Sequence, residues 1–204
     1  MSAPILAIDP QHPQPRLLQR AVDLLADGGV VAYPTDTYYA LGCDLDSRKG
    51  IERLYQLKAR DKRKPLSFIV PDLADVARYA LVSNFAYRTM KSLIPGPFTF
   101  VLPATRLVPT MMQNRQKQVG IRVPDAAVPR ALAAALGHPL VTTSAADAEG
   151  VPLMDPRDIK ELFGHGLELV LDGGIVTSQP STVVSLIDDH IEILRQGHGI
   201  IEGL

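Results

Sequence analysis

The stretch from Val30 to Val70 begins VVAYPTDTYYALGC and ends LYQLKARDKRKPLSFIV. Val30–Tyr33 and Phe68–Val70 are apolar runs of the length and composition that buried strands have. Residues 58–64, which lead into the second run, include five Lys or Arg in seven positions. Cations held so close together repel one another. This segment is therefore either a solvated basic loop or a site for a polyanion such as a nucleotide or RNA.

Polar side chains that suit a nucleotide lie at both ends of this stretch. Thr35 and Thr37 follow the first predicted strand, at the position where ligands bind in α/β sheets. Lys58 and Arg60 are separated by one residue, so in an extended segment both side chains point to the same face. Arg can bind phosphate or carboxylate through two parallel hydrogen bonds, whereas Lys acts as a point charge. Lys64 is a further candidate for a phosphate contact.

Four residues farther along the chain are also candidates. Arg122 lies in a strand-like run, and a strand arginine needs an anionic partner, either a bound anion or an internal carboxylate. Arg195, at the end of another strand, is a second candidate for binding a nucleotide phosphate. Ser144 and Ser181 lie at strand ends where a hydroxyl can face a crevice, although most such serines cap the backbone. The five His residues lack metal-ligand spacing, and we expect solvated positions for them.

Composition restricts the class of protein. The chain has 204 residues, of which 46% are hydrophobic, and we expect a single domain over residues 1–204. The formal net charge of −1 argues against nonspecific binding of nucleic acid. The single Cys43 excludes an internal disulfide, and we expect it to be a small buried residue. The sequence lacks a signal-peptide pattern and any apolar run near the ~20 residues that span a membrane, so we expect a cytoplasmic protein.

Hydrophobic periodicity and capping residues predict an α/β protein with a single-domain twisted mixed sheet and flanking helices. The predicted strands are Val30–Tyr33, Phe68–Val70, Phe98–Leu102, Val119–Val123, Leu140–Thr143, Leu167–Leu171, Thr182–Ile187 and Ile191–Leu194. The predicted helices are Arg16–Ala26, one from Ser47 to about Leu57, two short ones capped by Asp72 and Asn84, Ala127–Leu136, and one that begins at Asp155. We expect the last two strands to pair like a hairpin.

Short motifs along the chain resemble those of the YrdC family. In order they are Pro34–Gly42, Lys58–Arg60, Lys64–Leu66, Pro95–Thr99, Gly120–Pro124, Thr143–Ala145, Pro180–Val184 and Arg195–Gly197. The resemblance extends from about residue 15 to residue 198. Details such as Ala40–Cys43 look most like the YciO branch of this family.

This resemblance implies a YrdC-like fold and the synthesis of threonylcarbamoyl-adenylate from ATP, L-threonine and bicarbonate, the first step of the t6A modification of tRNA. It implies catalytic roles for Lys58 and Arg60. The residues implied to bind the substrates are Thr35, Thr37, Lys64, Arg122, Ser144, Ser181 and Arg195. Mg²⁺ would be carried with ATP, without a metal ion bound tightly by protein ligands. The alternative is a protein of the same fold that binds a nucleotide or RNA (double-stranded RNA or tRNA) without efficient turnover.

Three features depart from the YrdC pattern. The strand after Lys64–Leu66 often carries a histidine in the synthases, whereas here the run is Ser67-Phe68-Ile69-Val70. Synthases of the family usually contain Ser-Ala-Asn where this chain has Ser144-Ala145-Ala146. The missing amide removes a hydrogen bond, which we expect to weaken nucleotide binding by about tenfold. We expect residue 146 to lie in a surface loop that has room for asparagine. The third departure is Ala40 in place of a glycine, which would be strained if the position requires a positive φ.

Overall fold

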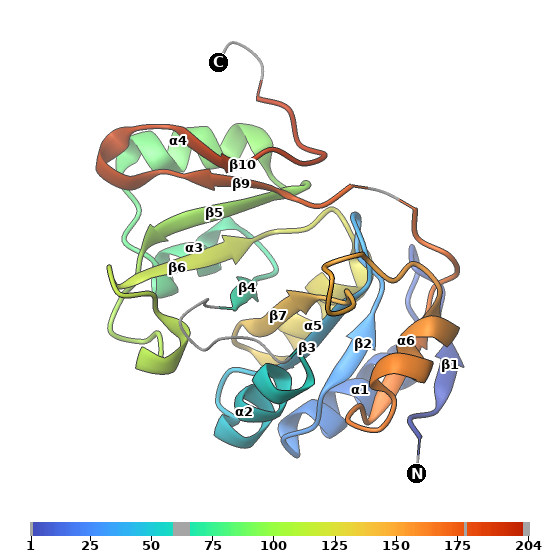
Figure 1. Cartoon of the computed structure of the whole chain (residues 1–204). Helices are drawn as coiled ribbons and strands as arrows, with labels where there is room; N and C mark the ends of the chain where they lie inside the picture. Colours follow the sequence, from blue (N-terminus) through green and yellow to red (C-terminus); the bar gives the residue numbers. More distant parts are fainter. Residues whose placement is uncertain (1, 59–65, 178, 202–204) are drawn as a thin grey trace.

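A computed structural model of the chain describes residues 2–58, 66–177 and 179–201 (Figure 1). In this part of the chain, one ten-stranded mixed sheet has the order β1-β8-β2-β3-β7-β4-β6-β5-β9-β10. Its strands are Ile5–Ala7 (β1), Val31–Tyr33 (β2), Ala40–Asp44 (β3), Ser67–Ile69 (β4), Phe98–Pro103 (β5), Gln118–Arg122 (β6), Leu140–Ser144 (β7), Leu169–Asp172 (β8), Thr182–Ser185 (β9) and Glu192–Arg195 (β10). The sheet twists between β2 and β5, so that these two strands run in clearly different directions in Figure 1 instead of lying side by side in one direction. The predicted α/β class with a twisted mixed sheet is confirmed.

Six α-helices and two short 3₁₀ turns flank the sheet in the described residues. The helices are Pro15–Ala26 (α1), Arg48–Leu57 (α2), Leu73–Tyr79 (α3), Asn84–Leu93 (α4), Ala127–Leu136 (α5) and Pro156–Phe163 (α6), and the turns are Thr110–Met112 and Ile187–Asp189. No helix among the described residues combines the length and apolar character needed to cross a membrane.

The predicted helix starts are mostly confirmed, because capping depends on local sequence. Ser47, Asp72 and Asp155 each accept a hydrogen bond from a backbone N–H of the first helical turn. The prediction for α4 is wrong by one residue. Ser83 is the N-cap, and its hydroxyl accepts from the Ala86 N–H at 3.1 Å, while Asn84 is the first helical residue.

Two strands were not predicted. β1 is three residues long, lies at the sheet edge and pairs only with β8, so it carries little periodic signal. β3 is central and pairs with β2 and β7. All five of its residues are buried, so it lacks the alternation of apolar and polar residues that marks a half-buried strand. Ala40 begins this strand and is not among the described residues with positive φ, so no strain arises there.

The helices cover the two faces of the sheet unequally. Residues of α2, α3, α4 and α6 join the apolar core on one face, which runs from β8 to β9 in the order of the sheet. On the other face, α1 and α5 pack over β2, β7 and β8. Within the described chain, this second core takes no residue from β5, β6 or β9. Those strands therefore have one face buried under helices and an opposite face that α1 and α5 leave uncovered.

Alternation along the strands determines which side chains occupy the uncovered face. In β5, Phe98, Phe100 and Leu102 point into the core, so Thr99 and Val101 point the other way. In β6, Val119 and Ile121 belong to the core. The uncovered face is consequently populated by small and polar side chains, which is where the candidate site lies.

Candidate functional site

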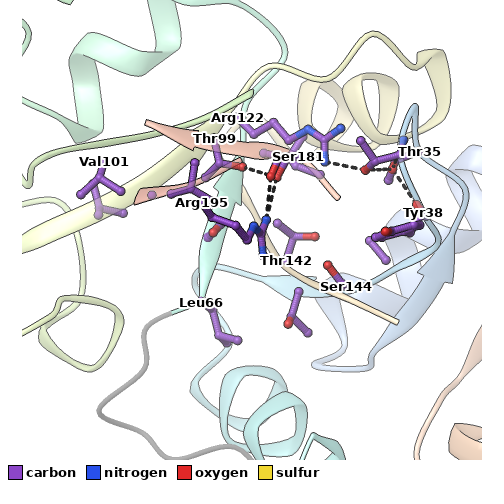
Figure 2. A pocket seen from close by; sticks show the side chains of 18 of the residues that line it. Thr35, Tyr38, Leu66, Thr99, Val101, Arg122, Thr142, Ser144, Ser181 and Arg195 are labelled. Carbon is purple, nitrogen blue, oxygen red and sulfur yellow. Dashed lines mark hydrogen bonds between the residues drawn. The ribbon is translucent and has the colours of Figure 1, made fainter. Parts of the chain in front are cut away.

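A cavity of about 320 Å³ occupies the uncovered sheet face. Its lining comes from Thr35, Thr37, Tyr38, Tyr39, Ala40, Leu66, Ser67, Ile69, Thr99, Val101, Asn114, Gln118, Val119, Gly120, Arg122, Thr142, Thr143, Ser144, Ser181, Val183, Leu194 and Arg195. Figure 2 shows Val101 at one end and Thr35 and Tyr38 at the other, with Ser181 and Arg195 between them. The cavity is thus elongated, with a hydroxyl-rich end and a more apolar end.

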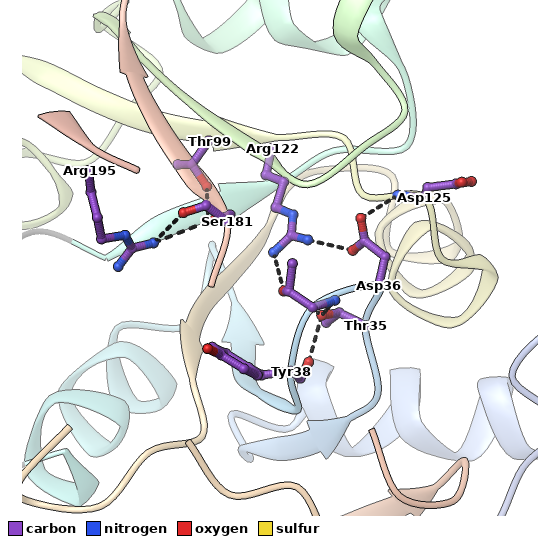
Figure 3. A network of polar contacts seen from close by, with 9 residues as sticks. Thr35, Asp36, Tyr38, Thr99, Arg122, Asp125, Ser181 and Arg195 are labelled. Atoms are coloured by element: carbon purple, nitrogen blue, oxygen red, sulfur yellow. Dashed lines mark hydrogen bonds and ion pairs between the residues drawn. The ribbon is translucent and has the colours of Figure 1, made fainter. Parts of the chain in front are cut away.

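An arginine from β6 connects to the segment after β2. The Arg122 Nη2 atom pairs with Asp36 Oδ1 at 2.5 Å, and Nη1 donates to Thr37 Oγ1 at 2.9 Å (Figure 3). The second oxygen of Asp36 accepts from the Asp125 N–H at 3.1 Å. Of the two partners that the sequence allowed for Arg122, the structure shows the internal carboxylate.

Burial shifts the pKa of Arg122, and one of its buried N–H groups lacks a hydrogen-bond partner among the described residues. Desolvation lowers the pKa of Arg122 from its ordinary value, and the neighbouring Asp36 carboxylate opposes that shift. The guanidinium nevertheless keeps its charge, since arginine is not deprotonated in proteins. The Nε atom is buried and has no hydrogen-bond partner among the described residues. A buried donor without a partner is costly, so this atom favours the presence of a water molecule or a ligand oxygen beside it.

Thr35 and Thr37 form a hydrogen-bonded turn at the hydroxyl-rich end. The Thr35 hydroxyl donates to the Tyr38 carbonyl at 2.6 Å and accepts from the Thr37 N–H at 3.1 Å. The two hydroxyl oxygens are 3.1 Å apart. Because the hydrogen of Thr35 is already used, Thr37 donates in this pair while accepting from Arg122. The structure brings both threonines to the cavity, and it uses the Thr35 hydroxyl to hold the turn.

A second arginine, Arg195, reaches the middle of the cavity from β10. The Arg195 Nη2 atom donates to the Ser181 carbonyl at 2.8 Å and lies 3.3 Å from the Ser181 hydroxyl. That hydroxyl is 2.9 Å from Thr99 Oγ1 on the neighbouring strand. Burial lowers the pKa of Arg195, and Tyr38 opposes the change. Among the described lining residues, Arg122 and Arg195 are the charged ones. Because Asp36 already pairs with Arg122, Arg195 supplies the positive charge that suits an anion in the cavity.

Six of the nine predicted site residues line this one cavity. They are Thr35, Thr37, Arg122, Ser144, Ser181 and Arg195. Arg60 and Lys64 lie outside the described residues.

Lys58, the remaining predicted residue, has a different environment from the one predicted. It ends α2 with φ −86° and ψ 0° instead of being extended. Its Nζ donates to the Ala146 carbonyl and lies 5.2 Å from the centre of the Phe163 ring. These contacts join α2 to α6 and to the segment after β7. Lys58 thus binds the carbonyl of Ala146, which is two residues after the lining residue Ser144.

The contacts of Lys58 predict a structural effect of its removal. Lys58→Ala removes a charged hydrogen bond and a cation–π contact, so we expect the free energy of unfolding to fall by about 1–3 kcal/mol. Urea unfolding measures this loss. Lys49→Ala, at an exposed position of the same helix, is the matched control and should change stability by less than about 0.5 kcal/mol. Equal stability of the two variants would show that the Ala146 and Phe163 contacts contribute nothing.

Several lining residues are not among the predicted site residues, although the alternation of side chains along a strand could have identified them. Thr142 lies two positions before Ser144, and Gln118 and Gly120 precede Arg122 at the same spacing, so each shares a sheet face with a predicted residue. The hydroxyls of Thr142 and Tyr33 also form a hydrogen bond of 2.7 Å, in which either can be the donor. Burial raises the pKa of Tyr33.

Three other expectations can be compared with the structure. Ala146 is not in an open surface loop, because it is 8% exposed and forms a bridge with Pro152. His138 is not simply solvated, because its Nε2 lies 3.4 Å from Asp44 Oδ1 and its side chain is 20% exposed. Cys43 is a buried core residue as predicted, and burial raises the pKa of its thiol.

Tyr39 helps to fix the edge of the cavity. Its hydroxyl donates to the Gly174 carbonyl at 2.6 Å and accepts from the Gly173 N–H at 3.0 Å. Burial raises the pKa of Tyr39 to about 12, so the hydroxyl keeps its proton and can make both bonds at neutral pH. This pair of bonds attaches the segment after β8 to the start of β3.

Comparison with known proteins identifies relatives of the whole chain. Residues 23–197 match the model of the Sua5/YciO/YrdC family, which carries the description "Telomere recombination". The crystal structure of E. coli YciO superposes with a TM-score of 0.92 at 34% sequence identity, over 98% of both chains. A threonylcarbamoyl-AMP synthase of Chromobacterium violaceum is 36% identical over 87% of this chain and 92% of its own length.

A more distant structure shows the same fold. P. abyssi Sua5 complexed with L-threonine has a TM-score of 0.89 at 24% identity, over 96% of this chain and 58% of the Sua5 chain. The family resemblance inferred from the motifs, including the likeness to the YciO branch, is confirmed by these matches. The chain belongs to the Sua5/YciO/YrdC family.

Proposed function

We propose that this protein is a nucleotidyltransferase of the threonylcarbamoyl-AMP synthase type, which uses ATP with Mg²⁺, L-threonine and bicarbonate. The observation that carries the proposal is the elongated cavity, which has hydroxyls and Arg122 at one end, Arg195 in the middle, and apolar side chains at the other end. A ligand with an amino acid, phosphates and a base in sequence matches that order of surfaces. The synthases among its relatives support the same reaction class.

The proposed reaction has two steps. The threonine amine combines with bicarbonate to give a carbamate and water. A carbamate oxygen then attacks the α-phosphorus of ATP, the bond from that phosphorus to the bridging oxygen breaks, and pyrophosphate leaves. The protein contributes positioning and charge neutralisation. Arg195 is placed to balance the negative charge of the phosphates with its planar guanidinium. Arg122, whose charge is paired with Asp36, would donate a hydrogen bond to the carboxylate from its Nε atom.

The other predicted residues would bind the amino acid and the triphosphate. Thr37 and Ser144 would bind the amino acid at the hydroxyl-rich end, near Thr142. Arg60 and Lys64, which lie outside the described residues, would bind the triphosphate through their positive charges, whereas the Lys58 ammonium is held by the Ala146 carbonyl. The described lining residues include no carboxylate, so Mg²⁺ would enter as part of the nucleotide, coordinated mainly by phosphate oxygens and water. The product would serve the t6A modification of tRNA.

Mass spectrometry tests this proposal. Incubation with ATP, L-threonine and carbon-13-labelled bicarbonate is expected to give threonylcarbamoyl-adenylate that carries the label, together with pyrophosphate. Leaving out threonine should abolish both products. ATP binding in calorimetry without any labelled product would contradict the synthase proposal and favour a nucleotide- or RNA-binding protein. Binding to RNA would then weaken steeply with salt concentration.

A further inference from the structure

A pair of amide side chains lies at the beginning of β6. Asn114 Nδ2 donates to Gln118 Oε1 at 2.7 Å, and Asn114 Oδ1 accepts from the backbone N–H of Gln118 at 2.9 Å. The backbone N–H of Asn114 also donates to the Gln118 carbonyl at 3.2 Å. Both side chains are partly exposed and line the cavity. The turn between them therefore holds two amides in a defined arrangement.

A backbone group fixes the orientation of both amides. The Gln118 N–H can only donate, so the Asn114 atom that faces it must be the carbonyl oxygen. The Asn114 nitrogen is then directed at the Gln118 side chain, which must present its oxygen in return. This arrangement leaves the Gln118 Nε2 group with both hydrogens free, since it donates to no other described residue.

The free amide lies at the apolar end of the cavity. Gln118, Gly120 and Arg122 alternate along β6 and so share the uncovered sheet face. Across from β6, Val101 of β5 lines the cavity, as do Val183 of β9 and Leu194 of β10. A flat apolar group would be covered by these aliphatic side chains, while its edge would meet an N–H donor of Gln118.

We propose that Gln118 determines nucleotide specificity by donating a hydrogen bond from Nε2 to a ring nitrogen of a purine base, with Asn114 as the positioning residue that orients the amide. Purine ring nitrogens accept hydrogen bonds, and the ring fits the aliphatic walls. The two amide oxygens already have partners, so the pair offers mainly donors. This assignment rests on the proposed function in that it requires a purine nucleotide as substrate, and it adds a residue that reads the base.

The variant Gln118→Met tests the hydrogen bond donated by Gln118 Nε2 separately from the apolar contacts of this side chain. Methionine has nearly the length of glutamine and no N–H group, so the apolar contacts remain while the hydrogen bond is lost. Loss of one neutral hydrogen bond is expected to weaken ATP binding by about two- to tenfold. Binding of inorganic tripolyphosphate, which has no base, should not change. Gln116→Met, at an exposed position in the same turn, is the matched control and should leave both affinities unaltered.

Deaza analogues identify the contact atom. We expect that one of 1-deaza-, 3-deaza- and 7-deaza-ATP binds the wild-type protein more weakly than ATP does, and that Gln118→Met removes this difference. Asn114→Asp still accepts from the Gln118 N–H, but it presents an oxygen to the Gln118 side chain. The Gln118 amide must then turn and use its nitrogen there. This variant should therefore also lose the discrimination among the analogues, which a purely structural role would not affect.

The outcomes separate this inference from the proposed function. If the wild-type protein binds ATP and Gln118→Met binds it equally well, or if ATP and tripolyphosphate weaken together in that variant, Gln118 does not read the base, while the synthase proposal stands. If the wild-type protein fails to bind ATP in calorimetry, both the assignment and the proposed function are overturned.

Discussion

Arg122→Ala is expected to lower the free energy of unfolding of the ligand-free protein by about 3–5 kcal/mol, because it leaves the carboxylate of Asp36 buried without its partner. The side chains of the pair are only 10% and 12% exposed, so solvent screens the remaining charge poorly. The same change removes the donor that holds the Thr37 hydroxyl. Urea unfolding with circular dichroism measures the loss.

A double-mutant cycle separates the pair from its surroundings. Asp36→Ala together with Arg122→Ala removes both charges, so the double variant should be clearly more stable than the sum of the two single losses implies. The expected interaction energy is of the order of 0.5–3 kcal/mol. A single variant Arg122→Ala that unfolds at the wild-type urea concentration would contradict the structural role. The arginine would then be held chiefly for a bound anion.

Local sequence was sufficient to predict most of the fold. The amphipathic pattern of α1 and the capping residues of α2, α3 and α6 depend on neighbours within one or two turns. The same reasoning missed β3, since a strand buried on both faces shows no alternation. It also misplaced the cap of α4, where Ser83 and Asn84 are both good capping residues and only the surrounding structure selects between them.

The site could be predicted only as a set of separate residues. Residue type indicated that Arg122 needed an anionic partner, but Asp36 is 86 positions away in the sequence and only the fold brings the two together. Lys58 was assigned to a phosphate site on the basis of its basic neighbours, whereas its contacts with Ala146 and Phe163 depend on how α6 packs. One face of β5, β6 and β9 is polar because α1 and α5 do not extend over these strands. The positions of the two helices over the sheet depend on tertiary packing and cannot be read from a local sequence pattern.

Gly120 keeps the middle of the cavity floor open. A Cβ atom at this position would lie 3.0 Å from Ser67 Oγ and 3.4 Å from Thr99 Cγ2. The Ser67 hydroxyl can rotate away from a single methyl group. The two further methyl groups of valine would extend into the space between Arg122 and Gln118, the neighbours of Gly120 on the same face of β6.

Gly120→Val is therefore expected to weaken binding of ATP by roughly five- to hundredfold, because a bound nucleotide would have to tolerate overpacking of about 1–3 kcal/mol. Stability of the ligand-free protein should change much less, since valine suits a strand and its added volume occupies an open cavity. Gly120→Ala is the graded control, with a smaller effect in the same direction. Calorimetric titration with ATP, beside urea unfolding of each variant, measures both quantities. Wild-type affinity in a correctly folded Gly120→Val protein would place the nucleotide away from β6 and contradict the orientation proposed for the whole ligand.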